Sequence, residues 1–147
     1  GNSFDPESPF AKGLRAFEAA DYRQAVEWFA QVDSTKNLNL AISATYMQGH
    51  AWFRMQQYEK AANAFRFVFQ QNRTLYTKDA KWKEALCLYA AFGVELQQKL
   101  LLLSACQSGT GSCGKYYDRL RESLRWTVEN YPARAQKAGE LLKRFEK

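Results

Sequence analysis

The sequence of 147 residues has little of what metal sites and catalytic nucleophiles need: one histidine, His50, and three cysteines, Cys87, Cys106 and Cys113. A structural zinc site takes about four Cys or His ligands in two close pairs, and a serine or thiol nucleophile needs a nearby base, usually histidine. Neither set is complete in this chain. We therefore expect no metal site, no cofactor and no catalytic residues, and we do not expect the chain to be an enzyme.

Long apolar runs and linker-like segments are also missing. The densest apolar stretch, Leu100–Leu103, is far shorter than the roughly 18 residues of a membrane span. No low-complexity or Pro/Ser-rich segment divides the chain. The glycine-rich stretch Ser108–Ser112 lacks the lysine and the preceding strand of a phosphate-binding loop. We expect one soluble globular domain over residues 1–147, with no membrane span and no nucleotide site.

The three cysteines leave two interpretations open. Cys87 falls in an apolar helical pattern, which indicates a small buried core residue. Cys106 and Cys113 bracket a loop of six residues and could close a short disulfide, or could remain thiols. An odd third cysteine weakens the argument for an oxidising compartment.

Positive charge and aromatic residues are abundant. The 21 Lys and Arg against 15 Asp and Glu give a formal net charge of +6, and there are ten Phe, eight Tyr and four Trp. From Lys115 onward, nine basic minus five acidic residues account for +4 of this charge. Because the acids are interspersed among the bases, this segment is typical of a solvated helical surface. We do not expect nucleic acid to be the partner.

A period of 36 residues runs through the chain up to Tyr89. Gly13, Gly49 and Ala85 occupy the same small-residue position in three successive units. In the first two units, a tyrosine follows this position after nine residues, an alanine after twelve and a phenylalanine after sixteen. These residues are Tyr22, Ala25 and Phe29 in the first unit and Tyr58, Ala61 and Phe65 in the second. Four coincident columns at one offset indicate a structural repeat.

The apolar spacing within each unit predicts two helices joined by a short turn. The helices are expected over residues 8–20 and 22–32 in the first unit and over 40–54 and 58–71 in the second. Polar turns at 33–37 and 71–74 separate the units. A glycine inside a helix costs about 1 kcal/mol relative to alanine, so its return at Gly49 indicates close packing of helices.

These columns resemble the tetratricopeptide repeat (TPR) family from Phe10 to about Tyr89. The resemblance implies an all-α fold: a right-handed TPR-like solenoid of helical hairpins, with two and a half to three repeats and a C-terminal capping helix. Repeat 1 is assigned to about residues 6–36, repeat 2 to about 40–73, repeat 3 to about 77–130 and the cap to 131–147. The third repeat departs from the pattern. Either an insertion over about 93–114 precedes its second helix, expected over 115–130, or its first helix runs on to Cys106, and the periodicity leaves both open.

The first helix of each hairpin lines the concave face of a TPR array, so the resemblance also implies a partner-binding groove. The residues expected to line it are Phe10, Leu14, Phe17, Tyr46, His50, Phe53, Arg54, Trp82, Leu86 and Tyr89. About half of these columns are expected to pack between repeats instead. Some members of the family clamp a free carboxylate terminus with basic residues on these helices. Positions 10, 46 and 82 are aromatic here, so that mode is not expected.

The sequence therefore favours a non-enzymatic scaffold that binds a protein or peptide partner in this groove. Two other functions stay open. One is a structural or self-associating soluble segment of a larger bacterial envelope protein; the other, with less support, is nucleic-acid or anionic-surface binding through the basic C-terminal helices. The start at Gly1 fits a processed or excised segment. With the Cys106 and Cys113 pair, it favours the bacterial periplasm or cell envelope over the cytoplasm.

Overall fold

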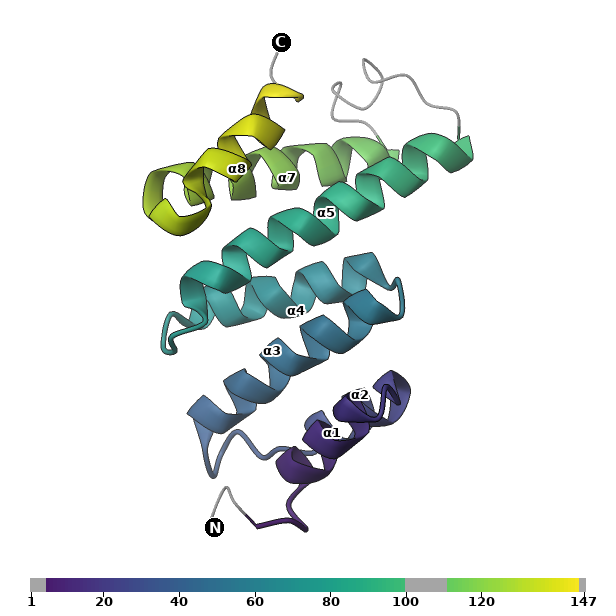
Figure 1. Ribbon diagram of the computed structural model, residues 1–147, viewed down its shortest axis with the longest axis vertical. Helices are drawn as coiled ribbons and strands as arrows, with labels where there is room; N and C mark the ends of the chain where they lie inside the picture. Colours follow the sequence, from purple (N-terminus) through teal and green to yellow (C-terminus); the bar gives the residue numbers. More distant parts are fainter. Residues whose placement is uncertain (1–4, 100–110, 146–147) are drawn as a thin grey trace. The chain divides into compact units, whose positions relative to one another are not determined.

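The computed structural model describes residues 5–99 and 111–145, and it contains seven helices and no strand over these ranges (Figure 1). The predicted all-α class is confirmed. The contacts divide the chain into two compact units, Gly1–Thr77 and Lys78–Lys147. Among the described helices, none has both the length and the apolar character needed to cross a membrane.

The first unit contains two helical hairpins, as the repeat predicts. α1 (Pro9–Glu18) packs against α2 (Tyr22–Phe29), and α3 (Leu38–Arg54) packs against α4 (Tyr58–Gln71). α2 also packs against α3, so the two hairpins lie side by side (Figure 1). The predicted limits of the four helices agree with the observed ones within three residues, and the largest difference is the earlier end of α2.

Both hairpins turn in the same way. Ala20 and Gln56, which are 36 residues apart, have φ angles of 60° and 61°, the left-handed conformation that often ends a helix. In each turn the N–H of the next residue donates to a carbonyl five residues earlier, at 2.9 Å. The caps of the following helices differ. The Asp21 carboxylate accepts a hydrogen bond from the N–H of Gln24 at 3.3 Å, whereas the Gln57 side chain makes no such bond.

Small residues allow the paired helices to approach closely. Gly13 on α1 lies against the ring of Phe29 on α2, and Gly49 on α3 lies against the ring of Phe65 on α4. The alanines of the repeat columns on α2 and α4 are fully buried. The sequence interpretation of the small-residue columns as packing positions therefore holds for both hairpins.

The connection between the hairpins is the polar turn expected at residues 33–37. The Asp33 carboxylate accepts hydrogen bonds from the Thr35 hydroxyl at 2.6 Å and from the Thr35 N–H at 2.9 Å. The hydroxyl bond is the main reason that the pKa of Asp33 lies below its ordinary value. Asn37 then caps α3 by accepting from the N–H of Leu40 at 3.0 Å.

The second unit is formed by α5 (Thr77–Lys99), α7 (Gly111–Asn130) and α8 (Pro132–Lys143), and only the first residue of α5 belongs to the first unit. Pro132 begins α8, as predicted, and α7 starts four residues before its predicted limit. α5 continues without a break past Gly93. An unbroken α5 agrees with the interpretation in which the first helix of the third repeat runs on, at least as far as Lys99.

Aromatic residues of α5, of α7 and of the segment just after α8 pack together in the core of the second unit. The ring of Phe92 on α5 lies 6.1 Å from that of Tyr117 on α7 and 5.3 Å from that of Phe145, just after α8. The Tyr117 hydroxyl donates a hydrogen bond to the backbone carbonyl of Phe145. Leu120 and Leu124, one turn apart on α7, are fully buried.

Residues 100–110 lie outside the described part of the chain, and with them Leu100–Leu103 and Cys106. The side chain of Cys113 lies outside it as well. The disulfide between Cys106 and Cys113 therefore stays a prediction, as does the rest of the insertion over 93–114.

Candidate functional site

The predicted groove residues on α1 serve mainly to pack the first hairpin. The ring of Phe10 lies 5.7 Å from that of Phe29. Leu14 and Phe17 are partly buried against the cluster formed by α2 and α3. Phe17 also meets Tyr22 edge-on at 5.3 Å. These contacts leave α1 with no strongly exposed member of the predicted groove.

On α3, the predicted residues form a strip of aromatic rings along one face. Tyr46, His50 and Phe53 are spaced four and three residues apart, so they share a helix face. The rings of Tyr46 and His50 lie 4.8 Å apart, and both rest edge-on against Phe65 of α4. Phe53 meets Tyr58 at 5.5 Å but remains 40% exposed. Arg54, the last residue of α3, is exposed beside it.

Tyr76 extends this strip, and the sequence analysis did not single it out. Its ring stacks on that of Tyr46, with centroids 4.4 Å apart and an angle of 13° between the planes, and the residue remains 38% exposed. Tyr76 lies 36 residues after Leu40, so extending the repeat columns to the start of the next helix would have found it. We call Tyr46, His50, Phe53 and Tyr76 the aromatic strip.

The predicted groove residues of the second unit differ in how exposed they are. Trp82 is 3% exposed, so it is a core residue and the prediction that it lines a groove is corrected. Its repeat position points inward, as Phe10 and Tyr46 do in the first two hairpins. Leu86 is half-buried. Tyr89 is 36% exposed, and its hydroxyl accepts a hydrogen bond from Arg144 at 3.3 Å. A continuous groove across both units stays a prediction.

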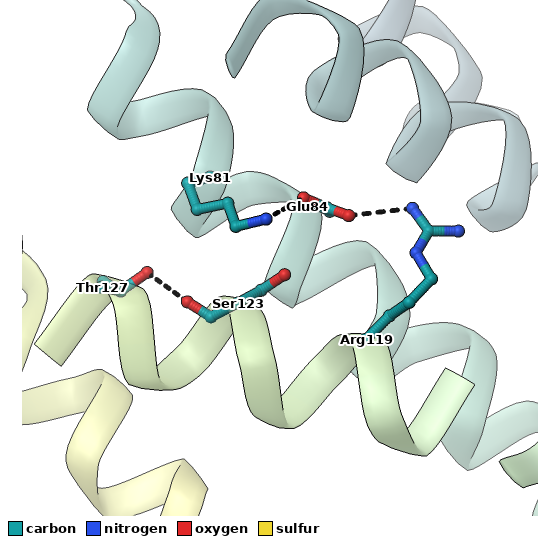
Figure 2. Close-up of polar contacts among 5 residues, drawn as sticks. All are labelled: Lys81, Glu84, Arg119, Ser123 and Thr127. Atoms are coloured by element: carbon teal, nitrogen blue, oxygen red, sulfur yellow. Dashed lines mark hydrogen bonds and ion pairs between the residues drawn. The ribbon is translucent and has the colours of Figure 1, made fainter. Parts of the chain in front are cut away.

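A buried charge cluster ties α5 to α7, and sequence reasoning missed it (Figure 2). Glu84 is 1% exposed and accepts from Lys81 Nζ at 3.0 Å and from Arg119 Nη2 at 2.8 Å. Burial of a carboxylate is costly unless cations and hydrogen bonds compensate it, and both oxygens are satisfied here. The arrangement is therefore a structural tie between helices, because Glu84 has no open side toward solvent. Nearby on α7, Thr127 donates to the carbonyl of Ser123 at 2.8 Å.

Cys87 lies on α5, as Glu84 does, and its thiol is poorly reactive. Burial raises the pKa of its thiol to about 12, and the negative charge of Glu84 contributes. A thiol with so high a pKa carries almost no thiolate at neutral pH, and the thiolate is the nucleophile. Within the described residues, no three His, Cys, Asp or Glu side chains gather as a metal site would require.

A cleft of about 590 Å³ opens in the first unit between α2 and the turn that joins α3 to α4. Its lining residues are Arg23, Val26, Glu27, Trp52, Met55, Gln57 and Lys60. Lys60 lies with its ammonium 4.6 Å from the centre of the Trp52 ring, a cation–π contact. Sequence reasoning did not connect these residues, because they come from three helices and no column of the repeat marks them.

Comparison with known proteins adds no relative: no protein-family model matches the chain, and no curated protein matches it.

Proposed function

We propose that the chain is a non-enzymatic protein-interaction module of TPR-like hairpins that binds a peptide or helix of a partner protein on the aromatic strip. The hairpin contacts support a repeat of this kind. Phe17 meets Tyr22 as Phe53 meets Tyr58, at 5.3 and 5.5 Å, and Phe10 meets Phe29 much as Tyr46 meets Phe65. The same contact pair therefore recurs at the 36-residue period.

The exposure of Phe53 and Tyr76 carries the proposal. Phe53 and Tyr76 keep more than a third of their surface open next to Tyr46 and His50, whereas the rings of Phe10, Phe17 and Tyr22 are partly covered by their own hairpin. Aromatic side chains anchor interfaces because they bury a large area and lose little conformational entropy. Tyr58 contacts the ring of Phe53, and Tyr46 stacks on the ring of Tyr76. Both rings are therefore held in place before a partner binds.

Selection from a displayed library of random 16-residue peptides tests the proposal. The folded chain serves as the target, and the affinities of the enriched peptides are measured by titration calorimetry. Phe53→Ala is expected to weaken their binding about tenfold or more, the usual effect of truncating an anchor ring. Phe67→Ala is the matched control, because Phe67 is 41% exposed but lies on α4.

The control separates the strip from a general effect of losing an exposed ring. Equal losses in Phe53→Ala and Phe67→Ala would contradict the assignment of the strip. Failure to enrich any peptide would contradict peptide binding itself. Sedimentation at increasing protein concentration addresses the rival function, since a self-associating structural segment would form oligomers without any added peptide.

A further inference from the structure

The cleft between α2 and the α3–α4 turn has the composition of a small protein-binding pocket. Its floor is apolar and half-buried, formed by Val26, Trp52 and Met55. Its rim is exposed and charged, formed chiefly by Arg23 and Lys60. An apolar centre inside a polar rim is the usual anatomy of an interface, and a volume of about 590 Å³ lies within the usual range of ligand pockets.

The charges on the rim favour an anionic ligand. Arg23 and Lys60 are both exposed, and neither forms an ion pair with any carboxylate in residues 5–99 and 111–145; the ammonium of Lys60 lies over the ring of Trp52. Glu27 is the only carboxylate that lines the cleft. Two cations therefore face one anion around an apolar floor, and complementary charge is what selects a partner at such a rim.

The cleft is separate from the aromatic strip. At about 100° per residue along α3, Trp52 and Met55 project about 120–180° away from the direction shared by Tyr46, His50 and Phe53. A ligand in the cleft therefore contacts the opposite side of α3. Binding at one site can be measured without the other.

We propose that this cleft binds an acidic peptide segment of a second partner protein, in which an apolar side chain stands next to carboxylates. The apolar side chain covers the exposed part of Trp52, beside Val26 and Met55. The carboxylates pair with Arg23 and Lys60 at the rim. Glu27 opposes this ligand by repulsion, so it restricts how closely the acidic residues can approach α2.

Three hexapeptides with blocked ends and a central Leu-Phe test the proposal: the flanking residues are glutamate in the first, glutamine in the second and lysine in the third. Each is titrated into the isotope-labelled full chain, and amide and indole NMR shifts report the site. We expect the glutamate peptide to shift the signals of Val26, Trp52 and Lys60. Its affinity should exceed that of the glutamine peptide about tenfold, as two exposed ion pairs can supply.

Substitutions at the rim should change the affinity for the glutamate peptide in opposite directions, according to the charge that they remove. Arg23→Gln with Lys60→Gln should lower the affinity for the glutamate peptide about tenfold, whereas Glu27→Gln should raise it. The matched control is Lys36→Gln with Arg66→Gln, which removes two exposed cations outside the cleft and should leave the affinity unchanged.

Several results would overturn the proposal. One is equal affinity for the glutamate and glutamine peptides, and another is tighter binding of the lysine peptide. A third is the same loss of affinity in the control variant as in the rim variant. Shifts confined to Phe53 and Tyr76 would place the ligand on the aromatic strip instead. Absence of any binding at about 5 mM peptide would also contradict it. Apart from shifts at Phe53 and Tyr76, which would support peptide binding on the strip, these outcomes do not bear on the proposed function, whose test uses Phe53.

Discussion

Gly13 and Phe29 are in such close contact that a methyl group on Gly13 would lie 2.5 Å from Cε1 of the phenylalanine ring. Gly49 and Phe65 repeat this relationship, with the corresponding distance 2.7 Å. Carbon atoms make favourable contact at about 3.5–4.0 Å, so neither site has room for a side chain. The two glycines are therefore packing residues, and each fixes how closely the helices of its hairpin approach.

Gly49→Ala should destabilise the first unit. Alanine favours a helix over glycine by about 1 kcal/mol, but the added methyl group must displace the ring of Phe65, which is 2% exposed and surrounded by the core. Overpacking of this kind costs about 1–3 kcal/mol, so the net change in the free energy of unfolding should be a loss. Urea unfolding followed by circular dichroism measures it.

Gly93→Ala provides the comparison for that variant. A Cβ at Gly93 meets no atom within 4 Å, so the helix propensity of alanine acts alone there. This substitution should stabilise the chain by about 0.5–1 kcal/mol. The packing argument would be contradicted if Gly49→Ala and Gly93→Ala changed the stability in the same direction.

Glu84→Gln should be strongly destabilising. The substitution keeps the shape of the side chain but removes the charge that Lys81 and Arg119 share, and the side chains of these cations are only 8% and 14% exposed. Removing one partner of a buried ion pair costs about 3–5 kcal/mol, because the remaining charge stays buried. Denaturant unfolding gives the change in free energy.

Glu7→Gln is the matched control for a carboxylate outside a core. The Glu7 side chain is 77% exposed and lies 3.6 Å from Lys12 Nζ. Exposed pairs contribute about 0–1 kcal/mol, so this variant should unfold almost like the parent chain. A similar small loss in both variants would show that the charge cluster does not tie α5 to α7.

The sequence could predict the helices and their pairing in the first unit, because glycine, alanine and aromatic columns at one period report on local packing. It could not separate inward from outward aromatic residues. Phe17 and Phe53 occupy the same column, yet one is partly buried and the other is 40% exposed. Glu84 gave no signal either, because a charged residue on a helix is ordinarily solvated, and only the approach of α7 buries it. The cleft forms where α2, α3 and α4 meet, so its lining residues come from two successive repeat units and no column of one unit marks them.

Gln57→Asp should stabilise α4 by giving it the cap that α2 already has. Asp21 precedes α2 and accepts a hydrogen bond from the N–H of Gln24, whereas Gln57, in the equivalent place, makes no side-chain cap. An aspartate at such a position contributes about 0.5–2 kcal/mol. The reciprocal variant, Asp21→Ala, should lose a similar amount. Thermal unfolding compares the two, and a loss of stability in Gln57→Asp would contradict the equivalence of the caps.

Cys87 should resist alkylation in the folded chain and should make stability depend on pH in alkaline solution. Burial raises the pKa of its thiol from the ordinary value of 9.0 to about 12, so the folded state holds this proton more tightly than the unfolded state. The contribution is fully present below about pH 9 and is lost as the pH rises toward about 12, because the unfolded chain ionises first.

The difference in the free energy of unfolding between the parent chain and Cys87→Ala isolates this effect from the other groups that titrate in alkali. Between about pH 9 and 12 the parent chain should lose stability relative to Cys87→Ala, since only the parent carries the thiol. At pH 8, iodoacetamide should leave Cys87 unmodified until denaturant is added, as peptide mapping by mass spectrometry can show. Rapid alkylation without denaturant would mean that the thiol is accessible and that α5 does not bury it.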